Sequence, residues 1–91
     1  MTYSSTSMPR GDDSQCPAIH VWTPNDPPRG VLVSAHAMGE HALRYGRFAC
    51  AANEAGFVVY AIDHRGHGQT VRSPEQLGDF GPDLWAGLLD D

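Results

Sequence analysis

The fold of this chain is decided by residues 31–41, which read Val31-Leu32-Val33-Ser34-Ala35-His36-Ala37-Met38-Gly39-Glu40-His41. A short apolar run that ends at turn signals is typical of a buried strand. The polar, glycine-containing bend that follows it therefore lies at the carboxyl end of that strand. Because ligands of open α/β sheets bind outside the carboxyl ends of the strands, we expect the bend to lie at the functional edge of the molecule.

A helix and a second strand follow the bend. Apolar residues recur at helical spacing, at Tyr45, Phe48, Ala49, Ala52 and Ala55. One face of a helix over residues 43–55 explains all five, and Gly56 stands where a capping glycine ends a helix. Residues 57–62 are continuously apolar, as in a parallel strand that is covered on both faces. Strand, helix and strand within about thirty residues predict a βαβ unit, with residues 31–35 and 57–62 as parallel neighbours.

The N-terminal part of the chain predicts one further strand. Residues 19–23 alternate in the manner of a half-buried strand, with Ile19 and Val21 on one face and His20 and Trp22 on the other. Residues 1–17 are rich in Ser, Thr and Asp, and we interpret them as a flexible arm or an edge strand with a turn.

A short helix is expected at the end of the sequence. Asp83 can cap it, and its apolar residues are Leu84, Trp85, Leu88 and Leu89, of which Trp85 and Leu88 are core candidates. Asp90 and Asp91 suit the middle of a longer helix better than its end, because carboxylates oppose the dipole there. The small sheet also leaves unpaired edges, so we interpret residues 18–91 as a partial α/β domain in which residues 31–35 form an exposed edge.

Composition and charge exclude several classes of function. The 91 residues are 41% hydrophobic and 19% charged, which is ordinary for a globular domain. A net charge of −5 with only six Lys and Arg argues against a nucleic-acid partner. No apolar stretch approaches the ~20 residues of a membrane helix, and residues 1–15 hold no apolar signal segment. The two cysteines lack metal-ligand spacing and suit thiols in a reducing compartment, so the expected location is cytoplasmic.

A second polar loop follows the second strand of the βαβ unit, at the same edge of the sheet as the first. It reads Asp63-His64-Arg65-Gly66-His67-Gly68-Gln69-Thr70. We predict that Arg65 and His67 brace the loop through hydrogen bonds to carbonyl groups, and that Gly66 and Gly68 supply special backbone angles. A His-x-x-His pair beside an aspartate also suggests a metal, but a glycine loop lacks the helical face of zinc motifs, so neither a metal nor a cofactor is expected.

The first loop contains its own candidate residues. His36 has no partner that it could activate as a base, so we interpret it as a structural histidine that ties the loop to its neighbours. Glu40 and His41 are predicted to form a hydrogen-bonded pair where the helix starts.

Three blocks of this sequence together carry a family resemblance. Residues 36–41 with Arg44-Tyr45 resemble an H-G-x-G-E-H…R-Y block, and residues 61–68 resemble an A-x-D-x-R-G-H-G block. Gly78-Asp79-Phe80 and the pair Asp90-Asp91 resemble a G-D-F block and the acidic pair after it. In this order and spacing, the blocks resemble the N-terminal portion of α/β-hydrolases of the monoacylglycerol lipase and lysophospholipase type. They cover about two thirds of the chain.

The resemblance implies roles for the residues that match. Met38 would offer its backbone N–H to an oxyanion, with His36 and Gly39 supporting that loop. Bracing of the two loops would fall to Glu40, His41, Asp63, Arg65, Gly66, His67 and Gly68. Ala37 stands where the family has glycine, which would strain the loop by about 1 kcal/mol if that position needs a positive φ.

The resemblance also implies what these residues lack. The family's nucleophile lies in G-x-S-x-G, and none of the serines of this chain does. The expected function is therefore that of the N-terminal part of a serine hydrolase of monoacylglycerol, lysophospholipid or similar acyl esters, inactive alone. Two alternatives stay open: a non-enzymatic module that associates through its exposed sheet edge, or a truncated product without function.

Overall fold

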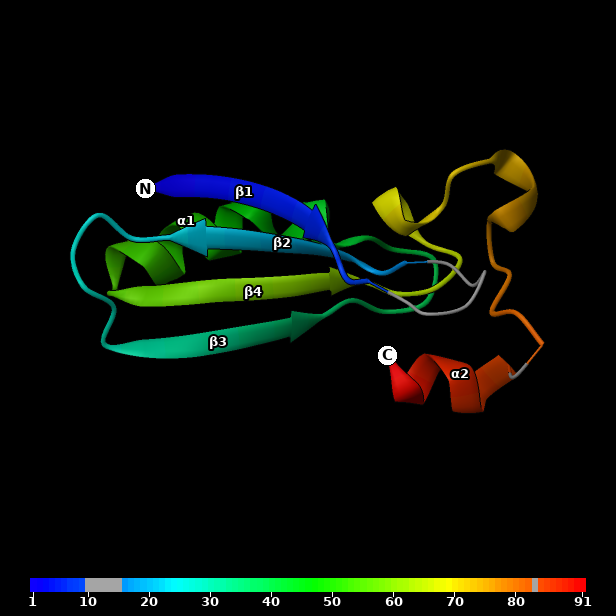
Figure 1. Ribbon diagram of the computed structural model, residues 1–91. Coiled ribbons are helices and arrows are strands. Elements are labelled where there is room, and N and C mark those ends of the chain that lie inside the picture. The colour runs from blue at the N-terminus through cyan, green and yellow to red at the C-terminus, as the bar shows by residue number, and fades with distance from the viewer. Residues whose placement is uncertain (10–15, 83) are drawn as a thin grey trace.

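The centre of the molecule is a four-stranded mixed sheet with strand order β1-β2-β4-β3 (Figure 1). The computed structural model describes residues 1–9, 16–82 and 84–91. The strands are β1 (Thr2–Ser7), β2 (Ala18–Thr23), β3 (Gly30–Ala35) and β4 (Phe57–Asp63). β2 pairs antiparallel with both β1 and β4, whereas β3 pairs parallel with β4. The predicted parallel pair is confirmed, and among the described residues β3 lies at one edge of the sheet with a neighbour on one side only.

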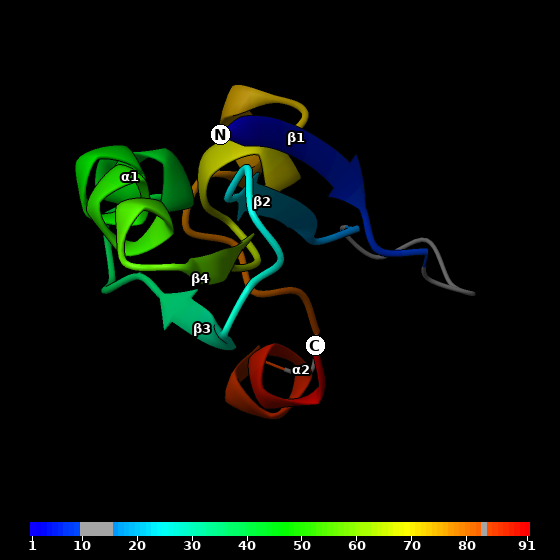
Figure 2. The ribbon, with the colours of Figure 1, turned by 90° about the vertical axis from the view of Figure 1, so that its left-hand side faces the viewer.

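One helix covers one face of this sheet. The chain from β3 to β4 forms the 3-10 helix η1 (Ala42–Tyr45) and then α1 (Gly46–Glu54). Two further 3-10 turns, η2 (Gly68–Thr70) and η3 (Pro74–Gln76), lead to α2 (Leu84–Asp90). Figure 2 shows α1 against one face of the sheet and α2 apart from it, beyond β3. The apolar core lies between α1 and the sheet and contains Trp22, Ala42, Ala49, Ala52, Val59 and Ala61, with Leu32 and Phe57 packed against it.

The helix differs from the sequence expectation in its start and in its buried face. Its first turn is a separate 3-10 helix, because the N–H of Ala42 donates to the Asp63 carboxylate at 2.7 Å and fixes the chain there. Ala49 and Ala52 are buried as expected, but Phe48 is 52% exposed and Ala55 is also exposed. Asn53 is buried in their place, since its amide donates to the carbonyls of β2 and β4 at the sheet end and so fixes the rotation of the helix.

The apolar side of α2 is mostly exposed, so the expectation that Trp85 belongs to the core is wrong. Leu84, Trp85 and Leu89 are 66%, 59% and 69% exposed, and the buried residue of this helix is Gly87. The reason is that α2 lies beyond the carboxyl ends of the strands and has no sheet face to pack on (Figure 1). The predicted cap, Asp83, lies outside the described residues.

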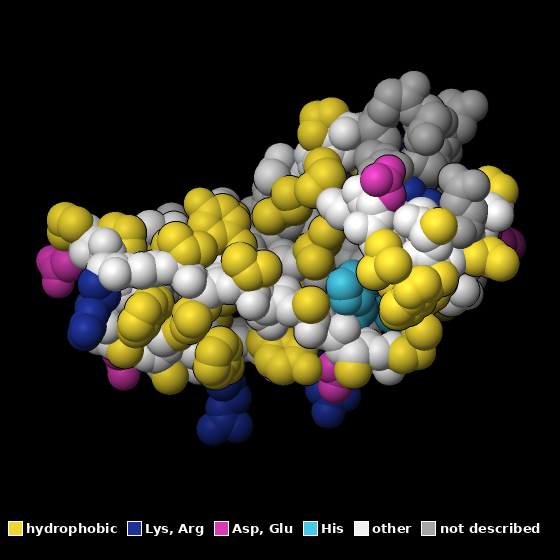
Figure 3. Space-filling model, turned by 90° about the horizontal axis from the view of Figure 1, so that it is seen from below, with side chains coloured by type: hydrophobic (Ala, Val, Ile, Leu, Met, Phe, Trp, Pro, Cys, Tyr) yellow, Lys and Arg dark blue, Asp and Glu magenta, His cyan; other side chains and the backbone are white. Residues whose placement is uncertain are grey.

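No described helix covers the second face of the sheet. Val31 and Val33 of β3 are 60% and 78% exposed there, and Tyr60 of β4 is 42% exposed. Seen from below, apolar side chains gather along β3 and again over α2, with histidine beside the second group (Figure 3). Within the described ranges, no helix is long and apolar enough to cross a membrane.

Candidate active-site edge

Two loops meet at the carboxyl ends of β3 and β4, and we name them loop A (residues 36–41) and loop B (residues 64–68). The N–H of His64 donates to Nε2 of His36 at 3.0 Å, and Nε2 of His64 lies 3.1 Å from the carbonyl of His36. The N–H of Gly39 donates to Nε2 of His67 at 3.1 Å. The edge expected from the sequence is therefore formed, because histidine side chains bond each loop to the backbone of the other.

Loop A contains a tight turn from Ala37 to Glu40. The N–H of Glu40 donates to the carbonyl of Ala37 at 3.1 Å, and Gly39 has a φ of +79°. A positive φ at the third residue is the mark of a type II turn, and it requires glycine there. Ala37 is not strained: Leu84 is the one described non-glycine residue with a positive φ.

The backbone amide of Met38 differs from its neighbours in this turn. The N–H of Ala37 donates to the Glu40 carboxylate at 3.1 Å, and those of Gly39 and Glu40 are bonded as described above. Within the described part of the chain, the N–H of Met38 has no acceptor. It lies in the turn that precedes η1, outside the hydrogen-bond ladder of any helix.

The histidines of the two loops serve as braces. Nδ1 of His36 lies 2.8 Å from the carbonyl of Ala37, and Nδ1 of His67 lies 2.8 Å from that of Arg65. Both nitrogens of each ring are therefore engaged, which leaves neither ring free to act as a general base. Burial, and then the neighbouring His36, lower the pKa of His64, so this ring is neutral at pH 7. Among the described residues, no group of three His, Cys, Asp or Glu side chains is arranged to hold a metal ion.

Glu40 stabilises the turn through a partner other than the expected one. Its carboxylate accepts hydrogen bonds from the hydroxyl of Tyr45 at 2.7 Å and from the N–H of Ala37. The Tyr45 hydrogen bond is the main reason that the pKa of Glu40 is lowered. The side chain of His41 is exposed and makes no capping hydrogen bond. At the start of η1, His41 takes part through its backbone carbonyl, which accepts from the N–H of Arg44.

Two hollows flank Met38. One has a volume of about 180 Å³ and is lined by His36, Met38, His64, His67, Phe80, Trp85 and Leu88. The other is more open, has a volume of about 490 Å³ and is lined by residues of both loops together with Leu77 and Gly78. The first is bordered by rings and aliphatic side chains, and apolar pockets with few polar groups are typical of sites for small organic ligands.

Asp63, at the end of β4, lies buried beneath both loops with 1% of its surface exposed. Its carboxylate accepts from the N–H of Ala42 at 2.7 Å and of Gln69 at 2.9 Å, and from Nε2 of His20 at 2.8 Å. Burial alone would raise the pKa of Asp63, but these hydrogen bonds outweigh it and lower the pKa below its usual value. A Cβ atom at Gly68 would lie 2.4 to 2.6 Å from this carboxylate, so loop B requires glycine at that position.

Arg65 braces loop B against α2. Its guanidinium donates to both carboxylate oxygens of Asp91, at 2.6 and 3.0 Å, and to the carbonyl of Phe80 at 3.2 Å. Both side chains are at least 95% buried, which makes this a bidentate internal ion pair. Gly66 has a φ of +73°, and a Cβ there would lie 2.7 Å from the backbone nitrogen of Asp79, so close backbone packing also demands glycine.

Sequence reasoning missed His20 as a member of this edge. It assigned the residue to one face of a strand, whereas the structure buries it completely against Asp63, 43 residues later in the chain. The available signal was a histidine at the centre of a strand next to tryptophan on the same face. A histidine on a core-facing position needs hydrogen-bond partners, and the sequence alone does not say which.

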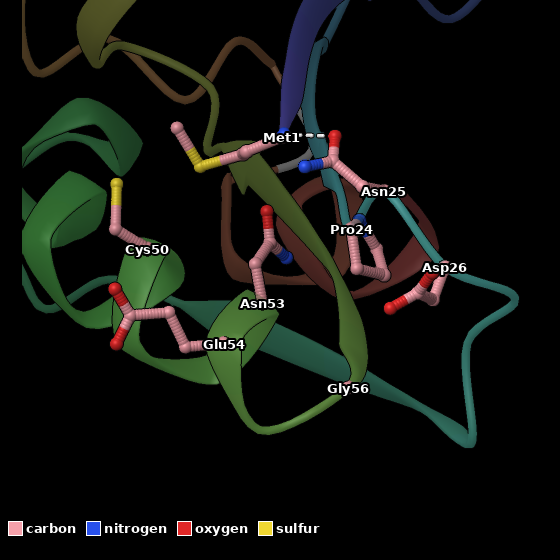
Figure 4. A pocket seen from close by; sticks show the side chains of 8 residues that line it. All are labelled: Met1, Pro24, Asn25, Asp26, Cys50, Asn53, Glu54 and Gly56. Atoms are coloured by element: carbon pink, nitrogen blue, oxygen red, sulfur yellow. Dashed lines mark hydrogen bonds between the residues drawn. The ribbon is translucent and has the colours of Figure 1, made fainter.

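A separate cavity of about 440 Å³ lies at the opposite end of the sheet (Figure 4). It is lined by Met1, Pro24, Asn25, Asp26, Cys50, Asn53, Glu54 and Gly56. Oδ1 of Asn53 has no hydrogen-bond partner among the described residues, and the ammonium group of Met1 donates to Asn25. None of its lining residues belongs to loop A or loop B, so this cavity is distinct from the edge that holds Met38.

Comparison with known proteins gives this edge a context. Residues 26–83 match the family described as serine aminopeptidase, S33. Over 60 residues the chain is 56% identical to a monoacylglycerol lipase of Mycolicibacterium smegmatis, covering 66% of this chain and 21% of the lipase. It is 32% identical over 68 residues to a monoglyceride lipase of Rattus norvegicus, covering 75% of this chain and 22% of that protein.

Among solved structures, a thermostable carboxyl esterase from Bacillus coagulans superposes with a TM-score of 0.74 and 35% identity. The match covers 85% of this chain and 25% of the esterase. The chain thus spans about a fifth of the length of the curated relatives it matches first.

Proposed function

Because the chain belongs to the serine aminopeptidase S33 family and folds as the N-terminal part of an α/β-hydrolase, we propose that it serves ester hydrolysis by supplying half of an oxyanion hole. The observation that carries this proposal is the amide of Met38. The N–H groups on both sides of it are bonded, that of Ala37 to Glu40 and that of Gly39 to His67 of loop B, and the N–H of Met38 has no partner among the described residues. A donor held in this way loses no existing hydrogen bond when it binds an anion.

The chemistry of acyl transfer requires such a donor. When a nucleophile attacks an ester, negative charge develops on the former carbonyl oxygen, and each preorganised donor to it stabilises the transition state by about 2.7–4 kcal/mol. The hollow beside Met38 offers room for part of an acyl ester, and its lining includes Phe80, Trp85 and Leu88. The names of the relatives support monoacylglycerols as substrates. The proposal includes lysophospholipids and similar acyl esters because the same lining suits an acyl chain.

The nucleophile is a part that these residues do not supply. In the α/β-hydrolase fold the serine lies in G-x-S-x-G, with the acidic residue and the histidine later in the chain. The serines here are Ser4, Ser5, Ser7, Ser14, Ser34 and Ser73, and none has glycines at those positions. In this proposal the 91 residues alone hydrolyse no ester, and the complete enzyme works in the cytoplasm, where the two cysteines remain thiols.

A chimeric enzyme tests the role of Met38. The segment of the M. smegmatis lipase that matches this chain is replaced by the residues of this chain, and ester hydrolysis is measured for M38P and M38A. Proline suits the second position of a type II turn, so M38P removes the N–H and leaves the turn intact. M38A removes only the side chain.

We expect M38P to lower kcat by a factor of about 10²–10³ with little change in KM, and M38A to stay within a few fold of the chimera. Equal kcat values for M38P and M38A would refute the role of this amide. A fluorophosphonate probe should label the chimera and not the 91-residue chain, and labelling of the chain itself would disprove its inertness.

A second candidate function is association through the free edge of β3. The observation that favours it is the exposure of Val31 and Val33 on a strand whose outer edge has no neighbour in the described residues. An apolar, unpaired edge is a template for adding a further strand. Sedimentation of the chain at increasing concentration would show this as reversible self-association, and a strict monomer would contradict it.

A further inference from the structure

Asp63 connects loop A to loop B from below. One of its carboxylate oxygens accepts from the N–H of Ala42, immediately after loop A, and the other from that of Gln69, immediately after loop B. The separation of the two loops therefore depends on where this single carboxylate lies. Something must hold the carboxylate itself, because an ionised group with 1% exposure has no water to solvate it.

His20 and Tyr3 provide that restraint. Nε2 of His20 lies 2.8 Å from Oδ2 of Asp63, and Nδ1 of His20 lies 2.7 Å from the hydroxyl of Tyr3. Because an ionised carboxylate can only accept, Nε2 of His20 carries a proton, and in the neutral ring Nδ1 then accepts from the tyrosine hydroxyl. The His20 ring is completely buried and forms a cluster with the rings of Tyr3 and Trp22, at centroid distances of 6.0 and 6.2 Å, while those two rings lie 5.2 Å from each other.

A second contact links β2 to the same point. The N–H of Ala18 donates to Oγ1 of Thr70 at 2.9 Å, and that hydroxyl donates to the carbonyl of Asp63 at 2.7 Å. The residues of the two N-terminal strands that make these contacts lie before the family match, which begins at residue 26. These residues of β1 and β2 therefore lie outside the region that the family match covers.

We propose that His20, held in one tautomer by Tyr3, is a positioning residue that fixes the Asp63 carboxylate and thereby the relative placement of loops A and B. The consequence of this positioning for catalysis, the orientation of the Met38 amide, rests on the proposed function. The hydrogen-bonded chain from Tyr3 through His20 to Asp63, which we call the clamp, requires no substrate, so it is tested on the 91-residue chain as it is.

The test compares three variants by NMR: H20L, H20Q and Y3F. H20L removes both ring nitrogens, H20Q keeps a donor near the position of Nε2, and Y3F removes only the tyrosine hydroxyl. The measured quantities are the titration of the Asp63 carboxyl carbon and the hydrogen exchange of the Ala42 and Gln69 amides. If His20 only filled space, H20L would leave the titration of Asp63 unchanged, and H20Q would have no effect to reverse.

In the wild type we expect Asp63 to titrate below its usual range. H20L should raise the pKa of Asp63 by at least one unit, a tenfold change in proton affinity, and speed exchange of both amides at least tenfold. In H20Q the pKa of Asp63 and the exchange rates of both amides should return most of the way to their wild-type values. In Y3F both quantities should lie between those of the wild type and those of H20L.

Unchanged titration and exchange in folded H20L would overturn the proposal. If H20L does not fold, the ring nitrogens of His20 in the wild type decide, because the clamp demands a proton on Nε2 and none on Nδ1. The reverse tautomer would refute it. Since no measurement involves an ester, a failed hydrolase proposal would leave these outcomes unaffected.

Discussion

The close approach of Gly68 to Asp63 leads to a prediction about G68A. The added Cβ would lie 2.4 Å from Cγ of Asp63 and 2.5 and 2.6 Å from its two oxygens, well inside van der Waals contact. Gly68 also has a φ of +49°. The substitution therefore combines backbone strain with displacement of a buried carboxylate. Gly39 offers a matched control, because its φ is +79° and a Cβ there would meet nothing within 4 Å.

The structure allows the two costs to be separated. Backbone strain in the left-handed region is worth about 1 kcal/mol, and this is all that G39A should lose. G68A should lose that amount and also one or two of the hydrogen bonds to the ionised Asp63, at about 1.5–3 kcal/mol each. The expected loss for G68A is therefore about 2.5–7 kcal/mol, which is a large part of the stability of a small domain.

Urea unfolding, followed by tryptophan fluorescence, measures both variants under identical conditions. Trp22 lies in the core next to His20 and should report the transition. Equal destabilisation by G68A and G39A would mean that Asp63 tolerates displacement, and the reasoning about loop B would fail. A loss above 2 kcal/mol for G39A would show instead that the turn of loop A carries more stability than its backbone angle explains.

Four further predictions concern charge and exposure. Because the pKa of Asp63 is lowered in the folded state, its contribution to stability is complete above about pH 3.9 and is lost as the pH falls through the folded pKa. D63N should therefore lower the free energy of unfolding near neutral pH and make it depend less on pH in the acid range. The pKa of His64 is also lowered, so stability should fall as the pH drops below about 6.5, and H64Q should remove that slope in the same urea series. R65M should cost about 3–5 kcal/mol because it removes the bidentate guanidinium partner of the buried Asp91 carboxylate. The double variant R65M/D91L should recover most of this loss, and additive losses in denaturation would contradict the pairing. V33K, at a 78% exposed edge position, should change stability by less than about 0.5 kcal/mol and abolish any concentration-dependent sedimentation of the wild type.

The βαβ unit could be predicted because its signals are local. The apolar runs of β3 and β4 predict strands from neighbouring residues alone, and Gly56 marks the end of the helix through its own φ of +96°. Loops A and B follow directly from these strands, since parallel neighbours end at one edge of the sheet. The positions of both loops at this edge can therefore be predicted from the sequence alone.

The rotation of α1 and the exposure of α2 could not be predicted in the same way. Periodicity places Phe48 on the same face as Ala49, but the carbonyls that Asn53 bonds lie on strands distant in the sequence and decide which side faces the sheet. An apolar pattern in α2 likewise indicates a face that can be buried, and only the arrangement of the layers decides whether a surface is present to bury it.

The sequence by itself determined the order of β2, β3, α1, β4 and α2 along the chain, the edge at which the loops meet and the glycine in the turn of loop A, because each depends on residues next to one another. It left residues 1–17 open between a flexible arm and an edge strand, and the structure forms β1 there. Only the tertiary structure decided that the N–H of Met38 has no acceptor among the described residues and that His20 bonds Asp63. Those facts depend on hydrogen bonds between segments separated by 28 to 43 residues. Local pattern carries no information about which polar group will be buried opposite which, and burial is what makes such pairings strong.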